Sequence, residues 1–185
     1  MPARGNGLSR LAARVALRVS GWRIDGALPN LQKFVVIIAP HTSNWDFLVG
    51  VTVMFALGVR PAFLGKDTLF RWPFGVVMRW LGGLPVDRFA PHQVVDQVIA
   101  RFHESEQLVL ALAPEGTRRK LPAWRTGFHF VARGASVPIV PVALDYPRRT
   151  IRILAPREAG ADVQDDLDAL GRLFTAEMAR HPEKY

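Results

Sequence analysis

Residues 34–46 read FVVIIAPHTSNWD, and this stretch decides the fold prediction. Its first six residues, 34–39, are apolar throughout and mostly β-branched, which is typical of a strand buried on both faces of a sheet. Pro40 ends that strand, and the next residue types, TSN at 42–44, often cap helices. Residues 46–57 are again mainly apolar and are predicted to form a helix. A buried strand followed directly by a helix indicates an α/β domain.

The rest of the chain continues this alternation of short apolar runs and amphipathic segments. Further strands are predicted at residues 62–64, 84–86, 108–113, 138–144 and 150–154. Further helices are predicted at residues 8–22, 91–104, 124–133 and 162–180. The predicted fold is therefore a single layered α/β domain, with a mostly parallel or mixed sheet flanked by helices. In such sheets, functional residues gather beyond the carboxyl ends of the strands.

Composition limits the possible functions. The 185 residues suit one domain, and 49% apolar residues can build a sizeable core. The absence of cysteine excludes disulfides, thiolate nucleophiles and cysteine metal sites. The net charge of +8 favours nucleic acid, anionic lipid or phosphorylated substrates, without choosing among them. No secretory signal is visible, and the longest uncharged apolar stretch, residues 47–59, is shorter than the roughly 20 residues of a membrane span. We therefore predict no transmembrane helix.

The predicted first helix, residues 8–22, has two chemically different faces. Its apolar positions recur at steps of three and four and are Leu8, Leu11, Val15, Val19 and Trp22. Its basic positions are Arg10, Arg14 and Arg18. One interpretation is a terminal helix packed on its own domain. The other is a helix lying in the plane of a membrane surface, with its arginines toward lipid phosphates. The sequence leaves both open.

A histidine and an aspartate follow the first buried strand with H-x4-D spacing. His41 stands before the predicted helix, where the chain can fold back over the helix start, and Asp46 lies in the first turn. Asp46 would then accept a hydrogen bond from one ring nitrogen of His41 and fix the tautomer. The other nitrogen would be able to take a proton from a hydroxyl. The alternative is structural, with the histidine capping the helix and Asp46 stabilising the helix dipole.

A second polar cluster follows the strand at 108–113. Gly116 permits close approach of a ligand to the backbone, Thr117 offers a hydroxyl, and Arg118 offers a fork of donors suited to phosphate. Arg88 ends another apolar segment and would strengthen such an anion site. The alternative for each arginine is a solvated surface charge. The chain has no phosphate-loop, nucleophile-elbow or metal-ligand motif, so no metal site is predicted.

Taken together, these motifs resemble the glycerolipid acyltransferase family, whose best-known members convert lysophosphatidate to phosphatidate. Four ordered blocks within residues 34–145 carry the resemblance. They are H-x4-D at 41–46, the segment 65–88 ending in GGLPVDR, PEGTR at 114–118 and VPIVPV at 137–142. The resemblance implies a glycerol-3-phosphate acyltransferase-like fold.

The resemblance also implies the site. His41 would be the general base, held by Asp46, and the acceptor hydroxyl would attack the thioester of acyl-CoA or acyl carrier protein. Neither an acyl-enzyme nor a metal or other cofactor would take part. The residues expected to bind the acceptor's phosphate are Arg88, Glu115, Gly116, Thr117 and Arg118.

On this interpretation, residues 1–25 are an N-terminal amphipathic basic helix and residues 26–185 an acyltransferase domain. The default acceptor is 1-acylglycerol 3-phosphate, giving phosphatidate. The alternatives are acylation of another lysolipid, a thioesterase, or a non-catalytic basic module that binds membranes. The expected location is cytoplasmic and peripheral, on the anionic inner face of the cell membrane. Nucleic acid is not an expected partner, because the aromatic residues stand in apolar runs rather than on a stacking platform.

Overall fold

The computed structural model describes all residues except 87–90, 119 and 121. The strands are β1 Arg23–Asp25, β2 Lys33–Ala39, β3 Ala62–Lys66, β4 Gly83–Val86, β5 Leu108–Leu112, β6 Ile139–Asp145 and β7 Thr150–Ile153. The α-helices are α1 Gly7–Val19, α2 Trp45–Leu57, α3 Phe74–Trp80, α4 Pro91–Glu104, α5 Gly127–Gly134 and α6 Val163–Gly171. Three short 3₁₀ helices are η1 Asp67–Phe70, η2 Ala176–Met178 and η3 Pro182–Lys184.

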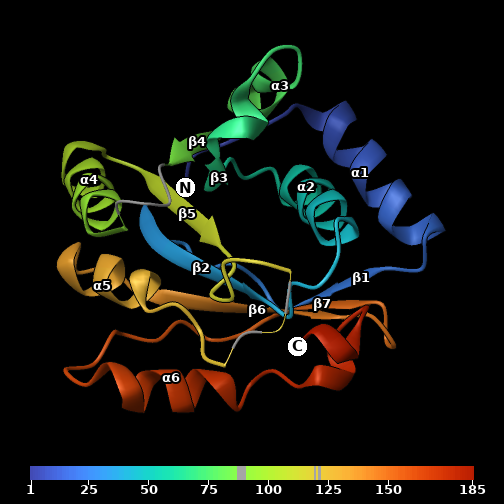
Figure 1. The fold of residues 1–185 in the computed structure, drawn as a ribbon. Helices are drawn as coiled ribbons and strands as arrows, with labels where there is room; N and C mark the ends of the chain where they lie inside the picture. Colours follow the sequence, from blue (N-terminus) through green and yellow to red (C-terminus); the bar gives the residue numbers. More distant parts are fainter. Residues whose placement is uncertain (87–90, 119, 121) are drawn as a thin grey trace.

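The strands form one seven-stranded sheet in the order β1-β7-β6-β2-β5-β3-β4 (Figure 1). Neighbouring strands run parallel except β6 and β7, which are antiparallel. The predicted fold class, one α/β domain with a mixed and mostly parallel sheet, is confirmed.

Strand β2 is buried on both faces, which explains its continuous apolar run. Val35 and Ile37 point into a core shared with α4 and α5, whereas Phe34 and Val36 point into a second core beneath α2. This alternation follows from the two-residue period of a strand. Figure 1 shows α4, α5 and α6 gathered on one side of the sheet and α1 and α2 on the other. The central strand is therefore fixed from both sides, and so is the position of the loop that follows it.

Helix α1 packs against α2 with the face opposite its apolar stripe. The buried residues of α1 are Ala13 and Leu17, which contact Ala56 of α2, and Arg14 Nε donates to the Ala56 carbonyl at 3.3 Å. The apolar stripe faces outward, with Leu8 75%, Leu11 60%, Val15 51% and Val19 82% exposed. The prediction of a helix is thus confirmed, but Ala13 and Leu17 rather than the apolar stripe form its contact with the domain.

Three predicted helices have other bounds in the structure, and α5 begins at Gly127 rather than at residue 124. The first helix ends at Val19 rather than at residue 22, and residues 23–25 join the sheet as edge strand β1. The last helix was predicted over 162–180, and that prediction is wrong beyond Gly171. Phe174 and Ala179 are both buried, whereas residues five apart on a continuous helix diverge by about 140°. The chain leaves the helix so that both side chains can reach the core.

Candidate active site

The candidate site forms at the carboxyl ends of three neighbouring parallel strands. Strand β2 pairs with β5 on one side and with β6 on the other. His41 follows β2, Glu115 follows β5, and Tyr146 follows β6 directly. The two clusters predicted from sequence, around His41 and Glu115, therefore meet in the structure, and a third strand end adds a residue that was not predicted.

His41 and Asp46 lie in direct contact. The Nδ1 atom of His41 is 3.1 Å from Oδ2 of Asp46, and the two side chains are 26% and 1% exposed. The loop between them folds back over the start of α2, so that the backbone N–H groups of Thr42 and Ser43 each donate to Asp46 Oδ2 at 2.8 Å. No hydrogen bond from a described residue to Nε2 of His41 is present. One ring nitrogen is thus oriented by a carboxylate and the other can meet a substrate.

Asp46 remains ionised although it is buried. Burial alone raises the pKa of this carboxyl, but hydrogen bonds from His41, Tyr146 and the Ser43 N–H outweigh burial, and the net pKa lies below its ordinary value. The Tyr146 hydroxyl donates to Oδ1 of Asp46 at 2.5 Å. Sequence reasoning missed Tyr146, although its place directly after a buried strand is the same signal that identified His41.

Glu115 supports the backbone of His41. Both of its carboxylate oxygens lie 2.9 Å from the His41 backbone nitrogen and accept from its N–H, and the residue is 7% exposed. Burial, together with the negative charge of Asp46, raises the pKa of Glu115 to about 7 in spite of the opposing effect of His41. The Glu115 carboxylate therefore binds the backbone N–H of the histidine. Its expected role toward the acceptor's phosphate stays a prediction.

The remaining predicted binding residues lie beside Glu115. Gly116 has φ +63°, which side-chain-bearing residues rarely adopt, and a Cβ atom there would lie 2.6 Å from Cδ of Arg125 and displace that side chain. Thr117 is half-buried and Arg118 is exposed. Arg88 lies outside the described residues. Arg125, whose backbone N–H donates to the Pro114 carbonyl at 2.8 Å, is a cationic neighbour that sequence reasoning did not single out.

The C-terminal segment also reaches the site. The backbone N–H of His181 donates to Thr42 Oγ1 at 3.2 Å. The Arg180 guanidinium carbon lies 5.0 Å from the ring centre of Trp45 and 5.9 Å from that of Tyr146. Because Arg180 was predicted to lie in the last turn of a helix, this contact could not be foreseen.

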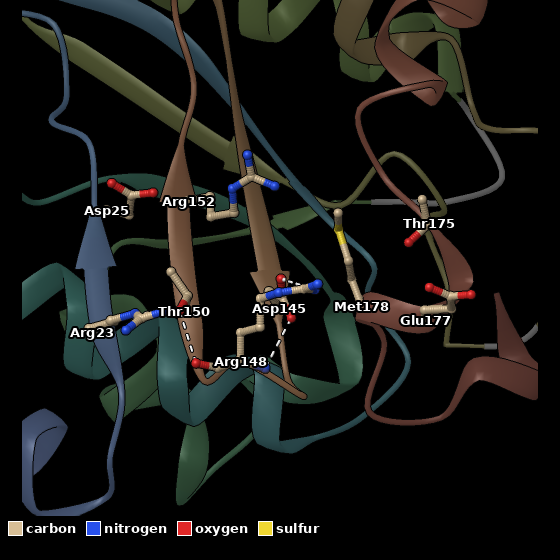
Figure 2. A pocket seen from close by; sticks show the side chains of 9 residues that line it. All are labelled: Arg23, Asp25, Asp145, Arg148, Thr150, Arg152, Thr175, Glu177 and Met178. Atoms are coloured by element: carbon tan, nitrogen blue, oxygen red, sulfur yellow. Dashed lines mark hydrogen bonds and ion pairs between the residues drawn. The ribbon is translucent and has the colours of Figure 1, made fainter.

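A separate polar hollow of about 420 Å³ lies over the β1–β7 edge of the sheet. Figure 2 shows arginine and carboxylate side chains mixed along its walls. Several are already paired: Arg23 Nε donates to Thr150 Oγ1 at 2.9 Å, and Arg148 Nη1 lies 3.2 Å from Asp145 Oδ2. None of the predicted site residues that the structure describes lines this hollow, so we treat it as separate from the candidate active site.

Family comparison agrees with this geometry. The model of the family described as Acyltransferase matches residues 23–145. This chain belongs to the acyltransferase family. The match extends from the first strand of the sheet to the last residue of β6, and it contains His41, Asp46 and Glu115.

Individual relatives of this chain carry a more specific name. The chain is 29% identical to the 1-acyl-sn-glycerol-3-phosphate acyltransferase of Haemophilus influenzae over 143 residues, covering 72% of this chain and 58% of that one. It is 30% identical to the Escherichia coli protein of the same name over 125 residues, covering 64% and 49%. The chain thus spans between about half and three-fifths of the length of these relatives.

A solved structure shares the fold. The crystal structure of the 1-acyl-sn-glycerophosphate acyltransferase PlsC from Thermotoga maritima superposes with a TM-score of 0.60, covering 90% of this chain and 75% of that one. The sequence identity is 16%, so this likeness concerns the fold alone.

Proposed function

We propose that this acyltransferase moves a fatty acyl group from a thioester to the free hydroxyl of a lysophospholipid, by default 1-acylglycerol 3-phosphate. The observation that carries the proposal is the His41–Asp46 pair, with Nδ1 held by a buried carboxylate and Nε2 available to substrate. The names of the relatives support the choice of acceptor.

In the proposed step, His41 acts as the general base. Nε2 takes the proton of the acceptor hydroxyl while the oxygen attacks the thioester carbonyl carbon. The tetrahedral intermediate collapses, the carbon–sulfur bond breaks, and the leaving sulfur takes the proton from the imidazolium. Asp46, ionised and buried, stabilises that imidazolium. The step needs no acyl-enzyme, metal or other cofactor, and much of its rate comes from holding the two substrates together.

The acceptor's phosphate is proposed to bind beside Glu115. The exposed Arg118 offers charge-assisted hydrogen bonds to the phosphate. In the same loop, Gly116 lets the phosphate approach the backbone and Thr117 offers its hydroxyl. Arg88 is proposed to contribute a second cation. The thioester donor is proposed to be acyl-CoA or acyl carrier protein.

Thiol release measured with and without lysolipid tests the proposal. We expect release from an acyl thioester to depend on 1-acylglycerol 3-phosphate and to yield phosphatidate. A panel of other lysolipids identifies the acceptor. Release that does not depend on an acceptor would indicate a thioesterase, and no release with either donor would indicate a binding module. Both results contradict the proposal.

We also propose that the protein works at the anionic inner face of the cell membrane. Leu11 and Val15 lie on an outward-facing apolar stripe of α1, and Arg18 near the end of that helix is also exposed. Exposed apolar residues beside arginines fit a helix lying in the plane of an anionic lipid surface. None of the described helices is long and apolar enough to cross a membrane.

A second exposed apolar group lies on the projection formed by η1 and α3, at the top of Figure 1. There Trp72 is 88%, Phe74 71% and Val76 69% exposed. This group is connected to the N-terminal segment, because the Arg4 guanidinium lies 4.5 Å from the ring centre of Trp80 and donates to its carbonyl. We therefore propose that α1 and α3 both contact lipid.

Vesicle flotation separates the contributions of the two helices. Leu11→Ser with Val15→Ser alters α1, and Trp72→Ser with Phe74→Ser alters the projection formed by η1 and α3. Leu31→Ser is a matched control at an exposed leucine outside both regions. Each pair should weaken binding to anionic vesicles, whereas the control should not. If neither pair changes flotation, the membrane proposal is wrong. If the pairs instead alter the oligomeric state in solution, the apolar faces are contacts between copies of the chain.

A further inference from the structure

We propose that Tyr146 is a positioning residue for acyl transfer: its hydroxyl fixes the Asp46 carboxylate so that this carboxylate holds the His41 ring in its reactive orientation. The inference rests on the proposed function. It extends the His41–Asp46 pair to a third residue, which acts through Asp46 rather than on the substrate.

The two oxygens of Asp46 have different partners. Oδ2 accepts from the backbone N–H groups of Thr42 and Ser43 and faces Nδ1 of His41. Oδ1 accepts from the Tyr146 hydroxyl, and no other described residue donates to it. Since the Asp46 side chain is 1% exposed, solvent is poorly placed to replace this bond. Without the hydroxyl, one oxygen of a buried carboxylate would lose its donor, which is costly and favours rotation of the group.

Tyr146 is itself held by three separate parts of the chain. It follows β6 directly, its backbone N–H donates to the Met178 carbonyl at 2.9 Å, and its ring meets the edge of Trp22 at 5.0 Å between centres. Arg180 lies over the same ring. These contacts fix the direction of the hydroxyl before any substrate binds, as positioning requires.

The chemistry of the hydroxyl suits a permanent donor. Burial, and then the hydrogen bond and negative charge of Asp46, raise the pKa of the Tyr146 phenol well above its ordinary value. The proton therefore stays on the tyrosine throughout the range in which an enzyme of this kind works. A residue committed in this way has no hydrogen left to donate to a substrate, so its effect should appear in turnover rather than in substrate binding.

Tyr146→Phe is the direct test, because it removes the hydroxyl and keeps the ring. We expect kcat for acceptor-dependent transfer to fall by roughly tenfold to 150-fold, the effect of one hydrogen bond to a charged group. The Michaelis constants of donor and acceptor should change little. The matched control is Thr52→Val, which removes a hydroxyl that donates to the Leu48 carbonyl at 2.8 Å within α2. It should leave kcat near the wild-type value.

A double-mutant cycle with Asp46→Asn distinguishes positioning from a structural role. If Tyr146 acts through the carboxylate, Tyr146→Phe should cause almost no further loss of kcat in the Asp46→Asn protein. An equal loss in both backgrounds would overturn the proposal. So would an unchanged kcat in folded Tyr146→Phe, or a Tyr146→Phe protein that fails to fold while Asp46→Asn folds. A wild-type protein without acceptor-dependent transfer would instead contradict the proposed function itself.

Discussion

The candidate active site and the outer face of α1 differ in how their side chains are held. Side chains of the site are buried and hydrogen-bonded, whereas those on the outer face of α1 are exposed to solvent. At the site, the Asp46 carboxylate is buried and accepts from Thr42, Ser43 and Tyr146. On α1, Leu8 is 75% and Val19 82% exposed to solvent. Substitutions at the site should therefore change the rate of chemistry. Substitutions on the outer face should change only what the protein binds.

The largest effect is expected at the buried end of this comparison. Asp46→Asn keeps the shape of the side chain but removes the carboxylate that orients His41, so turnover should fall by roughly a hundredfold or more. The measurement is single-turnover acyl transfer, with Asp67→Asn, an exposed aspartate in η1, as the control. Turnover near the wild-type rate in folded Asp46→Asn would remove the basis for treating the pair as a unit.

A smaller effect is expected at the exposed arginine of the site. Arg118→Ala should raise the acceptor's Michaelis constant by roughly tenfold to 150-fold, as expected for losing a charge-assisted hydrogen bond, and should change the donor's much less. Arg101→Ala, at an exposed arginine of α4, is the control. Equal changes for both substrates would place Arg118 outside the acceptor site.

The raised pKa of Glu115 predicts that the stability of the fold depends on pH. Its pKa is about 7 in the folded protein and ordinarily 4.5, so the unfolded chain loses this proton first as pH rises. The free energy of unfolding therefore falls as the pH rises from 4.5 to 7, by roughly 2 kcal/mol after allowing for partial solvent contact. Glu115→Gln should abolish that loss.

Urea unfolding at pH 5 and pH 7.5 measures this difference. The wild type should lose more stability between the two pH values than Glu115→Gln does. Glu106→Gln, at an exposed glutamate, should behave as the wild type does. The same pH dependence in all three proteins would show that burial does not raise the Glu115 pKa.

The smallest effect is expected on the outer face of α1, and two leucines of that helix make a matched pair. Leu17 is 6% exposed and Leu11 is 60% exposed. Leu17→Ala should lower the free energy of unfolding by about 2–3 kcal/mol, whereas Leu11→Ala should change it by less than about 0.5 kcal/mol. Comparable losses from thermal or urea unfolding would mean that the apolar stripe is packed in solution, which contradicts the outward face.

The sequence predicted most of this fold because its central strands are apolar on both faces. Residues 34–39 and 108–113 allow few other interpretations, and they correspond to β2 and β5 with shifts of one residue. Periodicity was less informative for α1. It predicts that apolar residues share a face, but which face packs depends on a neighbour, here Ala56 of α2, whose position is set by the tertiary fold.

The contacts of the candidate site are of two kinds, those that could be predicted from the sequence and those that depend on the tertiary fold. His41 and Asp46 are close in sequence, so their contact could be predicted from one loop. Tyr146 lies 100 residues from Asp46, and Arg180 reaches the site from the C-terminal segment. Contacts of this kind depend on strand order and on where a helix stops. In α6 that stop is at Gly171, in a stretch whose composition had suggested a longer helix.

His41→Ala tests the central claim most directly. The variant should keep its circular dichroism spectrum and thermal transition, because His41 is partly exposed and its backbone N–H can still donate to Glu115. Acceptor-dependent release of thiol and formation of phosphatidate should fall at least about a hundredfold, as expected for losing a general base. A folded His41→Ala protein that transfers acyl groups near the wild-type rate would contradict the account.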